Sequence, residues 1–412
     1  MNRGSGRRPN HSFPRDAIAV FRRHVKARDL TLEAMAADLE LSTTTIYNFL
    51  NGNVRKETTF DQHVVRFCKY LEIEPQQLLA EVRLLDQHGL ESAKYCMFIG
   101  DSLTLWYSRV GNGIAPIKDQ NIDLIYDGRS EVRFPSHLER LVHKVRDEHG
   151  KGMHDFDNNS LLTVLSGETS AWKGKDEEFY CKLILGKSDY AALYALRRTE
   201  DGKRLLKDYI DKWSPDILFE AATGQGVGVN VVVVTADDCM MLGRRSREVA
   251  VRTGQLDVSC VEGFNIKQDV GADAEESRRR FEPTPIALRA IHEEYGITDD
   301  KVRSVSFLNL GFDLQYAQWN LIALAKTSLS STQVRNRQRS VASQGIEYSD
   351  VYAVGCTNPK DVFTFLADDE RPVWSCGLAA AFYAQVALHG VSAVEDALQD
   401  IKFRDPERFL WD

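Results

Sequence analysis

The chain has 412 residues, of which 43% are hydrophobic and 27% are charged, and its formal net charge is −8. These values are ordinary for a soluble globular protein, and the length is sufficient for two or three domains. Apolar runs such as Val231–Val234 end within a few residues, and the N-terminus is basic and polar, which argues against a membrane span and a signal peptide. The seven cysteines are dispersed without a Cys-x-x-Cys pair, so we expect reduced thiols in a cytoplasmic protein rather than disulfides or a zinc site.

Positive charge is concentrated near the N-terminus. Residues 1–80 contain 12 lysines and arginines against 9 acidic residues, a net charge of +3, whereas the remainder of the chain carries −11. This distribution predicts a small domain that approaches phosphates, followed by an acidic body that does not. We expect residues 1–14 to form a flexible basic arm ahead of that domain.

Residues 15–82 show the apolar spacing of short helices. The apolar positions are Ile18, Phe21 and Val25, then Leu32, Met35, Ala36 and Leu39, then Ile46, Phe49 and Leu50, and finally Val64, Val65, Phe67, Cys68 and Leu71. Ser42 or Thr43 is placed to cap the third helix. The segment 30–52 resembles the helix-turn-helix of the phage-repressor family, although Glu40 occupies the turn position that usually holds glycine.

This resemblance implies that the second helix of the motif contacts DNA. The residues that it directs toward DNA are Thr43, Thr44, Thr45, Tyr47 and Asn48, with Arg55 and Lys56 placed to grip the phosphate backbone. Repressors of this kind read two half-sites, so the resemblance also implies a homodimer. The alternatives are a small helical bundle that serves dimerisation, or a helix-turn-helix that has lost its affinity for DNA.

Residues 83–220 predict an α+β middle region whose role the sequence does not reveal. The pattern predicts a helix over 135–149, strands over 161–165 and 179–185, and a second helix over 190–213. The string Gly100-Asp101-Ser102-Leu103 resembles the nucleophile block of SGNH esterases. No Asp-x-x-His follows to supply the base, so we interpret it as a strand and a turn.

Residues 221–396 have the pattern of a further domain, and residues 397–412 that of a tail. We expect a buried strand over 227–234 with a hairpin partner over 239–242, then strands over 302–312, 317–325 and 351–354. Helices are predicted over 332–343 and 374–389, and another helix ends at Gly296. For that helix, Thr284 is the expected N-cap and Pro285 the expected first residue.

The segment Arg289–Ile297 resembles the Nudix box, the signature of enzymes that cleave nucleoside diphosphates linked to another moiety. The resemblance covers about 222–395 and implies an α/β/α sandwich. It implies that Glu293 and Glu294 bind Mg²⁺ or Mn²⁺ and that Arg289 orients a glutamate, these three being the candidate catalytic residues. Ala290 stands where the signature has its first glutamate.

Further residues complete this candidate site. Glu262 or Glu282 is placed to supply the missing carboxylate as a metal ligand, and Arg244 and Arg245 to bind a ligand phosphate. In the alternative interpretation, Arg289 and Glu293 form an ordinary ion pair at i,i+4 spacing on the helix surface.

Together these patterns predict a multidomain α+β protein with an N-terminal helix-turn-helix bundle. We favour a sequence-specific, DNA-binding transcriptional regulator whose Nudix-like domain senses a nucleotide-derived diphosphate ligand. The alternative is a metal-dependent Nudix hydrolase that uses the helix-turn-helix for localisation or dimerisation. The expected partners are DNA, a nucleotide-derived small molecule and a second copy of the chain, with no membrane.

Overall fold

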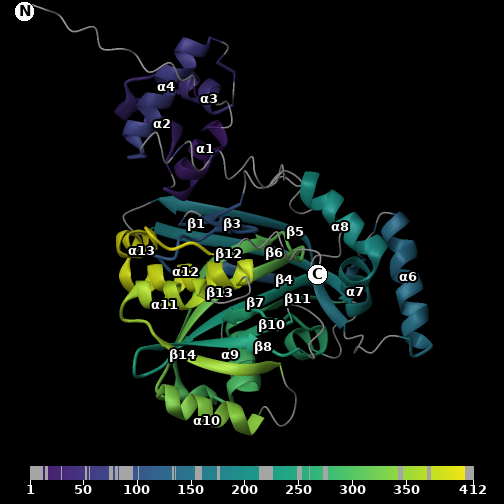
Figure 1. The fold of residues 1–412 in the computed structure, drawn as a ribbon. Coiled ribbons are helices and arrows are strands. Elements are labelled where there is room, and N and C mark those ends of the chain that lie inside the picture. The colour runs from purple at the N-terminus through teal and green to yellow at the C-terminus, as the bar shows by residue number, and fades with distance from the viewer. Residues whose placement is uncertain are drawn as a thin grey trace, which may run out of the picture. The chain divides into compact units, whose positions relative to one another are not determined.

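The computed structural model divides the chain into two compact units, residues 1–95 and 96–412 (Figure 1). It describes residues 13, 17–28, 30–51, 53–54, 56–73, 78, 82, 96–100, 102–131, 134, 136–153, 160–173, 177–212, 226–247, 253–258, 260–271, 277–341, 347–368 and 373–403. The predicted arm, except for Phe13, therefore lies outside the described residues, as do Arg55, Gly52 and most of the C-terminal tail.

The first unit is helical, as the apolar spacing predicts. Its helices are α1 (Ala17–Ala27), α2 (Leu32–Leu39), α3 (Thr43–Leu50) and α4 (Glu57–Tyr70). Aromatic rings form the centre of its core: the ring of Phe49 lies 4.6 Å from that of Phe67 and 5.8 Å from that of Phe21. Val65, one of the apolar positions used to predict α4, is 55% exposed and so lies outside this core.

The second unit is built on strands. They are β1 (Phe98–Ile99), β2 (Ser102–Leu103), β3 (Trp106–Val110), β4 (Ile122–Glu131), β5 (Ser160–Lys173), β6 (Glu177–Asp189), β7 (Gly226–Val234), β8 (Cys239–Arg245), β9 (Leu256–Val258), β10 (Cys260–Gly263), β11 (Arg278–Phe281), β12 (Val302–Asp313), β13 (Gln318–Thr327) and β14 (Tyr348–Gly355). All but β1 and β2 belong to one mixed sheet, whose main path runs β11-β4-β6-β5-β7-β13-β12-β3. Within it β7 and β13 are parallel, as are β4 and β6.

Helices complete the second unit. They are α6 (Ser136–Gly150), α7 (Tyr190–Arg198), α8 (Glu200–Lys212), α9 (Pro283–Tyr295), α10 (Ser331–Val341), α11 (Pro359–Ala367), α12 (Ser375–His389) and α13 (Val391–Leu398), with single turns η2 (Asp119–Asn121), η4 (Ile266–Val270) and η5 (Asp299–Lys301). The regions 83–220 and 221–396, considered separately in the sequence, contribute strands to the same sheet. A helical N-terminal region followed by a large mixed sheet with helices confirms the multidomain α+β prediction.

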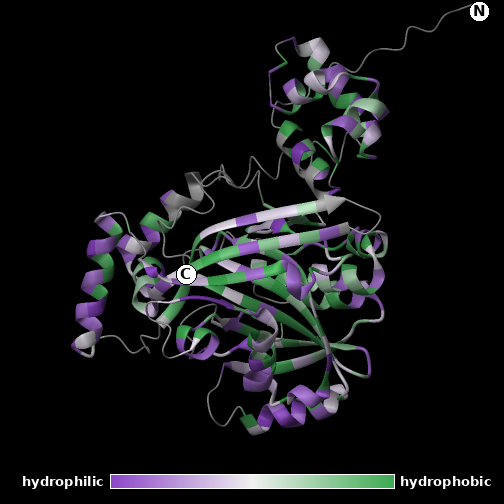
Figure 2. Ribbon diagram, turned by 180° about the vertical axis from the view of Figure 1, so that it is seen from behind, coloured by the Kyte–Doolittle hydropathy of each residue, from purple (hydrophilic) through white to green (hydrophobic). Residues whose placement is uncertain are grey.

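Two sets of helices cover the two faces of the central strands. Along β7, Val232 and Val234 pack in one cluster with α12, whereas the alternating Val229 and Val231 point to the other face, which α9 contacts. Figure 2 shows hydrophobic residues concentrated on these central strands, and polar residues on α6 and α10. All residues of β7 are buried because both faces are covered.

Some element boundaries differ from the prediction. The helix expected over 190–213 is interrupted at Thr199, whose backbone is extended and whose hydroxyl accepts a hydrogen bond from Gly202 N at 3.0 Å and donates one to Ala195 O at 2.6 Å. Thr199 thereby ends α7 and caps α8. Threonine side chains often form such bonds with nearby backbone groups, and these bonds compete with those of a continuous helix. The predicted N-cap Thr284 is also wrong: α9 begins at Pro283, and the hydroxyl of Thr284 bonds Asp119 instead.

Candidate functional sites: a helix-turn-helix surface and a carboxylate cluster

The turn between α2 and α3 is closed by local hydrogen bonds. The hydroxyl of Ser42 accepts a bond from Thr45 N at 3.0 Å and so caps α3, one of the two predicted caps. Glu40 takes the left-handed conformation, with φ 53° and ψ 42°, and its amide bonds Ala36 O. A glutamate therefore adopts the backbone that glycine usually provides, at a cost that the surrounding contacts must offset.

The C-terminal end of α3 is held by an arginine of α1. The guanidinium of Arg22 donates to the carbonyl of Leu50 and to Asn51 Oδ1, and Asn51 Nδ2 donates to Tyr47 O at 2.9 Å. A cation at this end satisfies terminal carbonyls and interacts favourably with the helix dipole. Ile46, predicted as the buried position of the helix, is fully buried. The orientation of α3 is therefore fixed by hydrogen bonds at both ends and by the burial of Ile46 in the core.

The outer face of α3 carries most of the residues predicted to contact DNA. Thr43 and Thr44 are exposed, Tyr47 is 55% exposed, and Asn48 is half-buried. The hydroxyl of Thr45 bonds Ser42 Oγ at 2.8 Å, so this threonine contributes to the cap. Lys56, just beyond the motif, is exposed. The hydroxyl and phenol groups of this exposed helix, with the ammonium group of Lys56 beyond it, can reach base edges and phosphates.

A cluster of ionisable side chains lies where α9 meets β10 and η4. The guanidinium of Arg289 donates to both carboxylate oxygens of Asp269 and, at 3.1 Å, to Glu262 Oε1. Its Nε lies 4.0 Å from Glu293 Oε1. Asp269 is nearly buried, whereas the side chain of Glu293 is 48% exposed. Arg289 therefore holds a carboxylate of β10 in place, while Glu293 stays at the margin.

Glu294 belongs to a more buried part of the same cluster. Its carboxyl group is hydrogen-bonded to that of Glu347, the residue before β14. Glu347 Oε1 in turn lies 2.6 Å from Arg245 Nη1, whose guanidinium is 4% exposed and 3.9 Å from the fully buried Asp257. Arg245 thus lies inside the protein, engaged with two carboxylates and over the ring of Tyr348.

The pKa values in this cluster reflect carboxylates that repel one another in a desolvated place. Burial raises the pKa of Glu262 to about 7, against the opposing effect of Arg289 and with a further increase from Glu293. Burial, followed by the charge and hydrogen bond of Glu347, raises the pKa of Glu294 well above its ordinary value despite Arg245. Without another cation, the cluster favours a shared proton between Glu294 and Glu347.

The structure brings some of the predicted ligands together and separates others. Glu262 lies close enough to Glu294 for its charge to raise the pKa of Glu294, whereas Glu282 is exposed at the start of α9. Arg244 donates to Gly254 O at 3.1 Å and lies over the ring of Tyr352. Across the described part of the chain, no three side chains of histidine, cysteine, aspartate or glutamate gather closely enough to enclose a metal ion.

Three acidic residues of the cluster were not found from the sequence: Asp257, Asp269 and Glu347. Glu347 reaches the cluster because β14 pairs with β8 in a register that sets Tyr348 opposite Arg245. No local sequence pattern predicts that strand pairing. Asp269 is held by the backbone amide of Asn265, which donates to Asp269 Oδ2 at 2.6 Å, and a backbone contact of this kind leaves no signal in the sequence.

Comparisons with known proteins address the first unit. No curated protein matches the chain. Among solved structures, DR0079 from Deinococcus radiodurans is 14% identical over 38% of this chain and 80% of its own, and its TM-score of 0.25 is too low to support a shared fold. No helix in the described residues is long and apolar enough to cross a membrane. Residues 21–82 match the family model of the Cro/C1-type HTH DNA-binding domain, which confirms the helix-turn-helix of the first unit and supports DNA as its partner.

Proposed function

We propose that the protein is a sequence-specific transcriptional regulator whose second unit binds a nucleotide-derived diphosphate ligand. The observation that carries the first half is the outer face of α3, where Thr44 and Tyr47 are exposed on a helix anchored at both ends. A side chain on a fixed helix contacts a base without losing backbone entropy on binding. The match to the Cro/C1-type family supports this use of the surface.

The carboxylate cluster supports the second half. Glu294 and Glu347 are hydrogen-bonded to one another in a desolvated place, which is the donor set that a hard divalent cation accepts. We propose that these two residues hold Mg²⁺ or Mn²⁺, with Glu262 held beside them by Arg289. Mg²⁺ usually keeps several waters and is bound by one or two carboxylates together with ligand phosphates, so two carboxylates suffice. The bound cation would neutralise the negative charge of the diphosphate.

Ala290 favours ligand binding without efficient turnover. An alanine at this position supplies no carboxylate to activate water, and its side chain is 1% exposed on the sheet side of α9. The residues with raised pKa values, Glu262 and Glu294, are engaged with Arg289 and Glu347. The ligand then acts by preferring one conformation of the protein, which is the requirement for any effector.

The test of DNA binding uses the full-length chain and a library of random duplexes. The expected result is enrichment of one sequence with two half-sites, about 10 base pairs apart from centre to centre, read by a homodimer. Thr44→Ala and Tyr47→Ala should weaken the selected site by about 1–3 kcal/mol each, a loss of about 5- to 150-fold, and relax its sequence preference. Gln62→Ala, on the exposed face of α4, is the matched control. Absence of any enriched sequence would contradict the proposal.

The test of ligand binding adds nucleoside diphosphate compounds with Mg²⁺ to the same protein and measures both turnover and affinity for the selected DNA. We expect one compound to change DNA affinity, and Glu294→Gln to abolish the change. Glu293→Gln should retain most of it, because Glu293 is half-exposed and contacts the edge of the cluster. Multiple turnovers that Glu294→Gln abolishes, without any effect on DNA affinity, would instead establish a hydrolase whose helix-turn-helix serves localisation or dimerisation.

A further inference from the structure

A cavity of about 470 Å³ opens at the far end of the central strands from the carboxylate cluster. It lies where the parallel strands β7 and β13 end, at Val234 and Lys326, and its wall is completed by the start of β12 and the end of α12. Glu262 pairs with Val229, five residues before Val234 along β7. At 3.3 Å per residue the two sites are about 16 Å apart along the strand. The cavity is therefore separate from the cluster.

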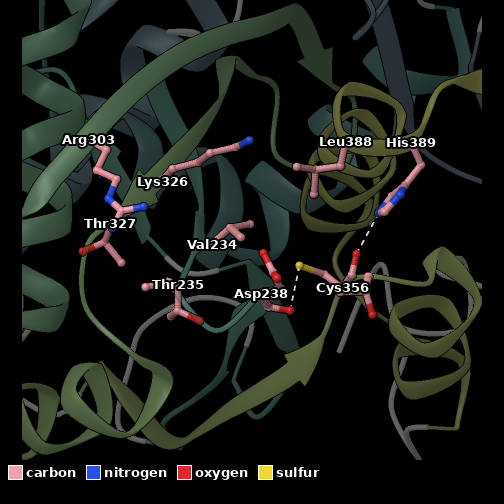
Figure 3. A pocket seen from close by; sticks show the side chains of 11 residues that line it. Val234, Thr235, Asp238, Arg303, Lys326, Thr327, Cys356, Leu388 and His389 are labelled. Atoms are coloured by element: carbon pink, nitrogen blue, oxygen red, sulfur yellow. Dashed lines mark hydrogen bonds between the residues drawn. The ribbon is translucent and has the colours of Figure 1, made fainter.

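Two cationic side chains line this cavity without a protein partner. Arg303 and Lys326 are exposed, and within the described residues neither side chain forms a hydrogen bond or an ion pair. In Figure 3 they lie on one side of the cavity, while Cys356 and His389 lie on the other. Cations that no carboxylate neutralises repel one another, and this repulsion is relieved when an anion binds between them.

The position of Arg303 results from a departure from regular strand pairing. Val302 pairs with Thr327 and Ser304 pairs with Lys326, which are adjacent residues on β13, so Arg303 is the extra residue of a β-bulge. A bulge redirects a side chain relative to the regular alternation of a strand and is common beside binding sites. Here it brings an arginine to the edge where the neighbouring strand presents Lys326.

The rest of the lining is suited to a small organic group. Val234 and Leu388 present apolar side chains. Cys356 is turned toward Asp238, whose backbone carbonyl accepts hydrogen bonds from Cys356 N at 2.8 Å and from Cys356 Sγ at 3.1 Å. On the other side of the cysteine, His389 Nε2 lies 2.7 Å from Cys356 O. These contacts fix the cysteine side of the wall. The one carboxylate of the lining, that of Asp238, belongs to this side rather than to the side of Arg303 and Lys326.

We propose that this cavity binds a small phosphate monoester, with the phosphate between Arg303 and Lys326 and the organic group against Val234 and Leu388. A guanidinium presents a fork of donors that matches phosphate oxygens, and an ammonium adds a second charge, which together suit a dianion. The volume lies within the range of small-molecule sites, and the location at the carboxyl ends of parallel strands is where open sheets commonly bind ligands.

The experiment is calorimetric titration of the full-length protein with phenyl phosphate and with inorganic phosphate, in EDTA so that no cation can bridge either compound to the carboxylate cluster. Arg303→Gln and Lys326→Gln should each weaken phenyl phosphate at least tenfold. Arg339→Gln, which removes an exposed arginine of α10 outside the cavity, is the matched control and should change nothing. Both pocket residues are exposed, so neither variant is expected to impair folding.

The organic half of the site has its own readout. Phenyl phosphate should bind more tightly than inorganic phosphate, and Leu388→Ser should reduce that preference. Equal affinity for the two compounds would overturn the monoester assignment. An equal loss in Arg339→Gln, or no saturable binding at millimolar concentrations, would overturn the site as a whole. Because this titration needs neither Mg²⁺ nor DNA, its failure leaves the proposed regulator function untouched.

Discussion

The raised pKa of Glu262 makes a quantitative prediction about stability. Glu262→Gln removes a carboxyl group that burial, opposed by Arg289, brings to a pKa of about 7. Glutamine keeps the shape of the side chain and an oxygen that accepts the bond from Arg289. The substitution therefore removes the titration of this group with little change in packing.

The magnitude follows from linkage between proton binding and folding. Each pKa unit corresponds to about 1.4 kcal/mol, so a rise from 4.5 to about 7 corresponds to about 3 kcal/mol. The pKa is higher in the folded state, so the folded protein retains a proton that the unfolded chain releases. The contribution of Glu262 to the stability of the folded state is complete below pH 4.5 and is lost as the pH rises through 7. Between pH 5 and pH 8, the free energy of unfolding of the variant should therefore rise by about 2–3 kcal/mol relative to that of the wild type.

Tryptophan fluorescence isolates the relevant unit. All six tryptophans follow residue 95, so denaturant unfolding followed by this signal reports on the second unit alone. The titrations are done in EDTA, with Glu282→Gln, an exposed carboxylate at the start of α9, as the matched control. A difference between wild type and Glu262→Gln that stays constant within about 0.5 kcal/mol from pH 5 to pH 8 would refute the reasoning. Saturating Mg²⁺ should flatten the wild-type profile, because a bound cation favours the ionised carboxylates.

Three further substitutions test how the fold is held. Ser42→Ala removes the cap of α3 and should cost about 1 kcal/mol, measured as faster hydrogen exchange of the α3 amides. Gly243→Ala places a methyl group 2.3 Å from the ring of Tyr348 and should destabilise the second unit by about 1–3 kcal/mol in the fluorescence assay, whereas an unchanged midpoint would contradict the tight contact. Trp374→Phe removes the indole donor to the buried carboxylate of Asp313 and should cost about 1–3 kcal/mol by the same assay.

Elements with a complete local signal were predictable from the sequence. The helix α6 appears almost where the spacing of Leu138, Leu141, Val142 and Val145 predicts it, and these residues are buried. The C-terminal end of α9 is set by Gly296, which takes the left-handed conformation with φ 62°. In both cases the determining interactions lie within one or two helical turns, so neighbouring residues contain the information.

Elements that depend on distant pairing were not predictable. The carboxylate cluster requires β10 to pair with β7 and β14 to pair with β8, so Glu262 and Glu347 meet α9 through contacts between distant parts of the chain. The bulge at Arg303 likewise exists only in relation to β13. Sequence spacing placed Glu293 and Glu294 on one helix but could not show that Glu294 faces the interior while Glu293 stays exposed.

Thermodynamic reciprocity separates the two proposed roles of the second unit more sharply than activity alone. If a ligand bound near Glu294 changes DNA affinity by some factor, the selected DNA must change the affinity for that ligand by the same factor. A coupling of 5- to 150-fold, about 1–3 kcal/mol, lies within reach of a direct titration. A hydrolase that the helix-turn-helix merely localises has no such requirement, because its substrate affinity is independent of the bound DNA. Ligand titrations with and without the selected duplex therefore decide between the two. At a duplex concentration that saturates wild type but not Tyr47→Ala, the shift in ligand affinity must be smaller in the variant, because less of the variant is bound to DNA.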